Sequence, residues 1–116
     1  MSKQFVLIPA EGDNRVITLE DGGDEVEFIQ GLVGGYFETM TVPEAMRTDA
    51  VGGVFWVDEN AGYKSVPVNF TSTYMTARVL KGTAVLTGPP NSEGETTSVP
   101  QKAIDVALEY NKVDVP

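Results

Sequence analysis

The residues best suited to chemistry in this 116-residue sequence are carboxylates, because the chain contains neither histidine nor cysteine. Residues 58–62, DENAG, have the spacing with which a calcium-binding loop begins. Such a loop also needs a bidentate acid at its twelfth position, where this sequence has Asn69. Asp, Asn and Gly are also the usual residues of a hairpin turn. We therefore expect a turn here rather than a calcium site.

A second acidic group surrounds the glycine pair at residues 22–23. It could bind a divalent cation weakly, but Asp24 and the glutamates after it are also typical of the capped, negatively charged start of a helix. The glycine pair precedes this helix, as in a phosphate-binding loop, yet the neighbouring carboxylates would repel an anion. We predict a solvated acidic face without a metal or phosphate site, made of Asp21, Asp24, Glu25 and Glu27.

The sequence offers no recognisable catalytic constellation. Its serines at 65, 72 and 98 have no histidine to activate them, and no thiolate is available. Paired-carboxylate catalysis depends on a separation that sequence does not reveal. We expect a non-enzymatic protein without a cofactor, and an uncharacterised hydrolase or transferase is the alternative.

The net charge of −9 comes from 17 acidic and 8 basic residues. Direct nucleic-acid binding is not expected, because no basic cluster is present to neutralise phosphates. The acidic surface could meet a basic partner, imitate nucleic acid, or serve only solubility. The first ten residues do not resemble a signal peptide, and no apolar run is long enough to cross a membrane. The sequence therefore predicts a cytoplasmic protein that does not contact a membrane.

The first half of the chain contains the clearest structural pattern. Residues 4–10 and 15–20 read as two strands of an antiparallel hairpin. The Asp24–Glu27 pair is a capping box that begins a helix, which places Val26, Ile29 and Val33 on its apolar side. The glycines at 34–35 end this helix, and residues 36–42 alternate as a strand.

The second half is predicted to add two strands and a helix. A loop at 43–53 precedes a buried strand at 54–58, and another strand spans 82–88. Residues 69–81 allow either a strand and loop or a helical turn. Ser98 and Gln101 form a second capping box, with Pro100 in the first turn of a closing helix. The order β-β-α-β-β-β-α predicts an α+β domain over 1–112, with about five mostly antiparallel strands, two helices packed on them and a tail at 113–116.

Four segments of this chain resemble a known family, domain of unknown function 3846. They are residues 32–38 (LVGGYFE), 54–60 (VFWVDEN), 66–69 (VPVN) and 82–86 (GTAVL), in the order that the family shows. The resemblance covers about residues 4–110. One departure is Phe70, which stands where the family usually has a basic residue, so a basic ligand contact is not expected there.

The resemblance implies an origin in bacteriophages or other mobile elements, whose small acidic proteins often bind host machinery stoichiometrically. We therefore expect an accessory protein that binds a host protein with a basic surface. The alternative is a nucleotide-binding protein with a site within one chain or across a homodimer, for which the best cations are Lys64, Arg78 and Lys81. Asn69 could contact a ligand or bond to backbone in a turn. The candidate binding residues are Tyr36, Glu38, Asp58, Glu59 and Asn69.

Overall fold

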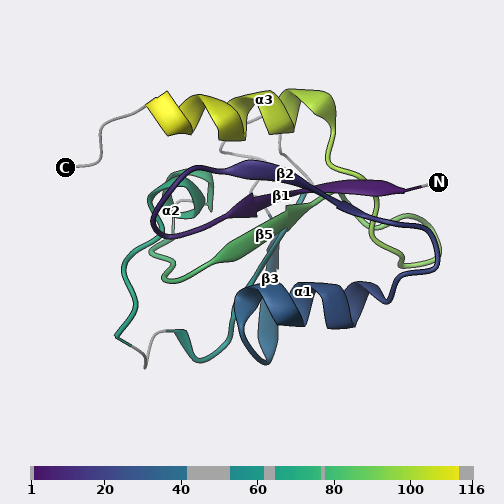
Figure 1. The fold of residues 1–116 in the computed structure, drawn as a ribbon, viewed down its shortest axis with the longest axis horizontal. Coiled ribbons are helices and arrows are strands. Elements are labelled where there is room, and N and C mark those ends of the chain that lie inside the picture. The colour runs from purple at the N-terminus through teal and green to yellow at the C-terminus, as the bar shows by residue number, and fades with distance from the viewer. Residues whose placement is uncertain (1, 42–52, 62–64, 77, 113–116) are drawn as a thin grey trace.

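A five-stranded antiparallel sheet forms the centre of the protein (Figure 1). The computed structural model describes residues 2–41, 53–61, 65–76 and 78–112. The strand order is β2-β1-β5-β4-β3, so the late strand β5 lies between β1 and β4. This sheet confirms the predicted α+β class. The strands are β1 (Lys3–Ile8), β2 (Arg15–Leu19), β3 (Phe37–Thr41), β4 (Val54–Asp58) and β5 (Ala84–Thr87).

Helices cover both faces of the sheet, and each face has its own apolar core (Figure 1). Helix α1 (Glu25–Val33) packs Ile29 and Val33 against Phe5 and Val85 on one face. On the other face lie α3 (Gln101–Glu109), its 3-10 extension η3 (Tyr110–Lys112) and the short helix α2 (Phe70–Thr76). The two alanines and the isoleucine of α3 are buried in this core, and Leu108 packs partly buried against it.

The ends of α1 follow the sequence pattern closely. Asp24 is the N-cap, and its carboxylate accepts a hydrogen bond from the backbone N–H of Glu27 at 3.1 Å. Gly34 ends the helix with φ +91°, a left-handed conformation that favours glycine, and its N–H donates to the carbonyl of Gln30. One detail of the prediction is wrong: Val26 is 50% exposed. The buried side of the helix runs through Ile29 and Val33, with Phe28 and Leu32 beside them.

The segment that the sequence left open forms a third helix, α2. Asn69 precedes it, is fully buried, and accepts a hydrogen bond from the N–H of Ser72 at 3.0 Å. The Asn69 amide group also donates to the carbonyls of Ile8 and Gly82, at 2.8 Å each. One side chain therefore connects α2 to the end of β1 and to the segment before β5.

The start of α3 differs from the prediction. Pro100 is the N-cap residue and makes no side-chain cap, so the helix begins at Gln101. The Ser98 hydroxyl accepts instead from the backbone N–H of Gln4 at 2.9 Å. The N–H of Val99 likewise donates to the carbonyl of Gln4. The capping-box prediction for Ser98 is wrong, because this residue is bonded to the first strand.

Several predictions fall on residues outside the described ranges. They concern most of the loop at 43–53, the side chain of Lys64 and the tail at 113–116. No helix in the described ranges combines the length and the apolar character needed to cross a bilayer.

Candidate functional site

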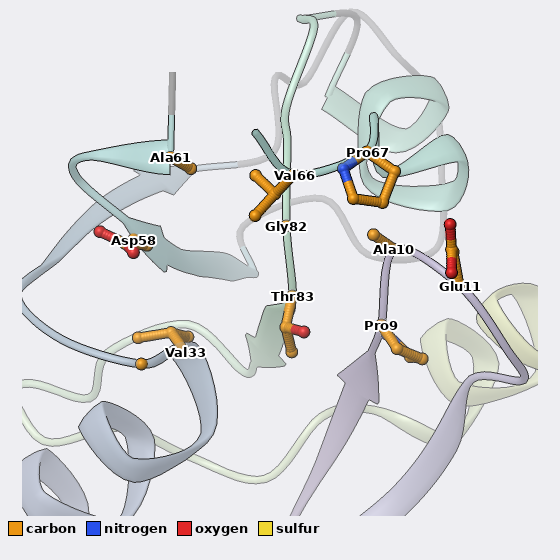
Figure 2. Close-up of a pocket in the computed structure, with 11 residues that line it drawn as sticks. Pro9, Ala10, Glu11, Val33, Asp58, Ala61, Val66, Pro67, Gly82 and Thr83 are labelled. Carbon is orange, nitrogen blue, oxygen red and sulfur yellow. The ribbon is translucent and has the colours of Figure 1, made fainter. Parts of the chain in front are cut away.

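Five strand ends and two further segments meet at one end of the sheet, which we call the converging end. The strand register brings the ends of β1 and β4 beside the starts of β2, β3 and β5, because each pair is antiparallel. The C-terminus of α1 and residues 66–67 reach the same place (Figure 2). Residues far apart in the sequence are thereby brought together at this end.

The first hollow at the converging end has a volume of about 360 Å³ (Figure 2). Each of the four segments that carry the family resemblance contributes to its wall, and residues 9–11 close another side. The wall is made largely of small and apolar groups, with carboxylates from two sides. The contributing residues are Pro9, Ala10, Glu11, Val33, Gly34, Asp58, Ala61, Val66, Pro67, Gly82 and Thr83.

A second hollow, of about 390 Å³, adjoins the first and shares Asp58 and Ala61 with it. Glu38 of β3 and Glu59 line it from one side, and Lys81 lines it from another. Val79 is also part of its wall and is 73% exposed. The structure thus brings together the predicted residues Glu38, Asp58 and Glu59.

The two other predicted binding residues lie elsewhere. Tyr36 is 73% exposed and lines neither of these hollows, although its carbonyl accepts from the N–H of Glu59 at 3.0 Å. Asn69 has no exposed surface, and its amide is bonded to backbone groups. It therefore takes the backbone-bonding role that the sequence left open and cannot contact a ligand directly.

The Asp58 turn has the geometry expected from its residue types. The Asp58 carboxylate accepts from the backbone N–H of Asn60 at 2.8 Å, which is the bond of an Asx turn. A turn is confirmed on the described residues 59–60, but β4 pairs with β3 and β5, so this turn does not join two strands of a hairpin as predicted. Across the described ranges, no group of three or more acidic, histidine or cysteine side chains is arranged to hold a metal ion.

The opposite end of the sheet carries the predicted acidic face, and we call it the acidic end. A hollow of about 280 Å³ there is lined by Lys3, by residues 19–23, by Glu25 and by Glu95. Glu95 comes from the loop that links β5 to α3, close to the loop that precedes α1 (Figure 1). Sequence reasoning missed both Lys3 and Glu95, because only the fold brings these distant residues to the α1 start.

One member of the acidic face is engaged within the protein. Glu25 forms an ion pair with Lys3, and both side chains are partly buried. Burial acts to raise the pKa of Glu25, but hydrogen bonds from Lys3 and Thr96, together with the lysine charge, outweigh it. The pKa of Glu25 is therefore lowered. Asp21, Asp24 and Glu27 are exposed to solvent.

A third hollow, of about 350 Å³, also lies at the converging end, between residues 9–14 and the aromatic residues Phe70 and Tyr110. None of its aromatic residues was among the predicted site residues. The spacing of Phe70 and Tyr74 would place them on one side of a helix. This spacing could not identify the aromatic residues from the sequence, because residues 69–81 were compatible with either a strand or a helical turn.

Together, these features define a small α+β protein with an antiparallel sheet between helices and with open, carboxylate-lined hollows at both ends. The family model described as Domain of unknown function (DUF3846) matches residues 3–112. The chain belongs to this family, as the four sequence segments indicated. No curated protein and no solved structure matches the chain significantly.

Proposed function

We propose that the protein acts without catalysis, by docking its acidic end onto a basic surface of a partner protein. The observation that carries this proposal is the grouping of carboxylates around one hollow, in which the single lysine is already paired with Glu25. If the chain comes from a phage or another mobile element, the partner would be a host protein.

Exposure and charge support docking at this end. Glu20, Asp24, Glu27 and Glu95 are exposed and come from two loops and the first turn of α1. Such a patch raises the rate of encounter with a positively charged surface, and salt at 0.1 M largely screens this attraction beyond about 10 Å. Binding of this kind needs no histidine, cysteine or cofactor.

The nucleotide-binding alternative has less support. The first hollow at the converging end is lined by Glu11 and Asp58, which would repel a phosphate. Lys81 lines the second hollow, but Glu38 and Glu59 line it too. Carboxylates therefore line both of these hollows, which disfavours nucleotide binding there.

The test is capture of partners from a bacterial lysate by the immobilised protein, followed by mass spectrometry. Glu20→Gln with Glu27→Gln removes two exposed charges and leaves both the Asp24 cap and the Lys3–Glu25 ion pair in place. We expect this variant to recover about three- to tenfold less of the specific partner, since each exposed ion pair contributes about 0.2–1 kcal/mol. Raising the salt from about 50 to about 500 mM should abolish capture by the wild type.

The matched control is Asp105→Asn with Glu109→Gln on α3, where both side chains are exposed. It also changes the net charge from −9 to −7 and should capture as much partner as the wild type. Equal loss in both variants would mean that only overall charge matters. Salt-resistant capture, or full capture by the acidic-end variant, would refute the proposal.

A further inference from the structure

The third hollow, on the α3 side of the converging end, has features that neither the predicted site nor the proposed function uses. Its lining comes from the β1–β2 turn, from α2 and from η3. The turn supplies one wall through residues 9–14. The helices supply the opposite wall through Phe70, Thr71, Tyr110 and Asn111.

The helical wall continues into a cluster of three aromatic rings. The centroids of Phe70 and Tyr74 are 4.5 Å apart, and the centroid of Tyr110 lies 6.1 Å and 6.4 Å from them. Tyr74 is 57% exposed at the outer side of this cluster. An exposed group of rings can accept a flat or cationic group on its faces.

The two walls are held in place by Asn14, which is 5% exposed. Its amide donates to the hydroxyl of Thr71 at 3.0 Å and to the carbonyl of Ala107 at 2.9 Å. Its backbone N–H donates to the side-chain oxygen of Asn111 at 2.7 Å, and its carbonyl accepts from the same side chain at 3.0 Å. The turn is thus fixed against α2, α3 and η3, so a ligand would find the hollow already formed.

The charge of the hollow is negative. Among the described residues that line it, the charged ones are Glu11 and Asp13, and both are exposed. Arg15 follows closely in the chain, but its register partner Leu7 belongs to the core on the α1 face. Partners in register point to the same side of the sheet, so Arg15 points away from the hollow.

We infer that this hollow binds an arginine side chain from an exposed segment of another protein. A guanidinium is planar, so it can stack on an aromatic face while its N–H groups donate to carboxylates. Lysine offers the charge without the flat surface, and a phosphate would be repelled by Glu11 and Asp13. A face-to-face contact between the hollows of two copies is disfavoured, because both copies would present carboxylates.

This inference goes beyond the proposed function. It assigns a second, chemically more selective surface at the end of the sheet opposite the acidic end. It rests on the aromatic cluster and two carboxylates, none of which takes part in docking at the acidic end. Either proposal can therefore fail while the other stands.

The experiment is an NMR titration of the ¹⁵N-labelled protein with a blocked Gly-Arg-Gly peptide. Matched peptides carry lysine or citrulline in place of arginine, and citrulline keeps the planar shape but has no charge. We expect saturable shifts of amides at residues 10–14, 70–74 and 110–111. The lysine and citrulline peptides should each bind at least about threefold more weakly, because each lacks one of the two interactions.

Three variants assign the binding energy to the two walls. Tyr74→Leu and Phe70→Leu each remove one ring and should weaken arginine binding about three- to tenfold. Glu11→Gln with Asp13→Asn should weaken it to a similar extent and abolish the preference over citrulline. The exposed position of Tyr74 keeps the test usable if Phe70→Leu lowers stability. The control is Asp105→Asn with Glu93→Gln, which removes two exposed charges outside the hollow and should bind as the wild type does.

Equal shifts with arginine and citrulline peptides would overturn the inference, as would shifts confined to the acidic end. Absence of any shift at about 10 mM peptide would also overturn it, since even a weak side-chain site would be partly filled. Shifts at the same residues that depend on protein concentration without peptide would assign the hollow to self-association instead.

Discussion

The two ends of the sheet are built from different kinds of interaction. At the converging end, residues from six parts of the chain line adjoining hollows, and a buried amide, Asn69, bonds three backbone segments together. At the acidic end, exposed carboxylates sit on loops, and the fixed side-chain contacts include the Lys3–Glu25 ion pair and the Asp24 cap. The structure of the converging end is held by buried hydrogen bonds and packing, and the surface of the acidic end is dominated by charge.

This difference shows where stability and binding are separated in the molecule. A buried hydrogen-bond network tolerates little change, because every lost partner leaves a polar group without water. An exposed acidic surface tolerates many changes, because solvent screens and hydrates each charge. Substitutions of the buried polar groups at the converging end should therefore affect folding, whereas those of exposed carboxylates at either end should affect association.

The sharpest test of this difference replaces one asparagine at each end. Asn69→Ala leaves two carbonyls and one N–H of the core without a partner, and we expect it to lower the free energy of unfolding by about 3–5 kcal/mol. The comparison at the acidic end is Asn91, which is exposed and whose side-chain oxygen accepts from the backbone N–H groups of Glu93 and Glu95. Asn91→Ala should cost less than about 1 kcal/mol. Urea unfolding followed by circular dichroism measures both values.

Asn69 also shows why the converging end was harder to predict than the acidic end. Its partners Ile8 and Gly82 are remote in sequence, and its role depends on α2, which is rich in threonine and only seven residues long. Local propensity does not favour a helix there, so tertiary contacts decide the conformation. Asp21, Asp24 and Glu27, by contrast, are exposed, and their place at the start of a helix follows from the local sequence, so they could be predicted directly.

The same reasoning explains the remaining outcomes of the sequence analysis. The five strands and the Gly34 stop come from local patterns, and all of them are present. The placement of β5 between β1 and β4 is non-local, because no turn chemistry encodes it. Ser98 had the residue type of a helix cap, but the neighbouring strand β1 provides a competing donor in Gln4. Pattern reasoning therefore succeeded for most local features, although it placed the exposed Val26 on the buried side of α1.

A second test compares glycines with positive φ at the two ends. Gly34 closes α1 at the converging end with φ +91°, and Gly22 lies in the turn at the acidic end with φ +82°. Alanine at Gly34 should lower the free energy of unfolding by about 1–2 kcal/mol, since the left-handed conformation is strained for it. Gly22→Ala should cost less, because an exposed turn can relax. Thermal unfolding of both variants measures the difference.

Gly31 provides a control at which alanine should raise, rather than lower, the free energy of unfolding. It lies inside α1 with ordinary helical geometry, and an added Cβ would meet nothing within 4 Å. Gly31→Ala should therefore stabilise the protein by about 0.5–1 kcal/mol. Equal losses at Gly34 and Gly22 would contradict the idea that the converging end is the more rigid of the two.

The smallest expected effect concerns the Lys3–Glu25 ion pair at the acidic end. The pKa of Glu25 is lowered from its ordinary value of 4.5 in the folded protein, so folding favours its charged form. Its stabilising contribution is complete above the unfolded-state pKa and is lost as the pH falls through the lower, folded-state pKa. Glu25→Gln should remove about 0.2–1 kcal/mol of stability at pH 7 and little in strong acid.

The control for this pH dependence is Glu27→Gln, which neutralises a carboxylate in the same turn of α1 but leaves the ion pair with Lys3 intact. Urea unfolding between about pH 3 and pH 7 should show the gap between wild type and Glu25→Gln closing as the solution becomes acidic. The Glu27→Gln variant should keep the acid-induced loss that Glu25 causes. A constant gap for Glu25→Gln at every pH would mean that packing, rather than charge, holds this end together.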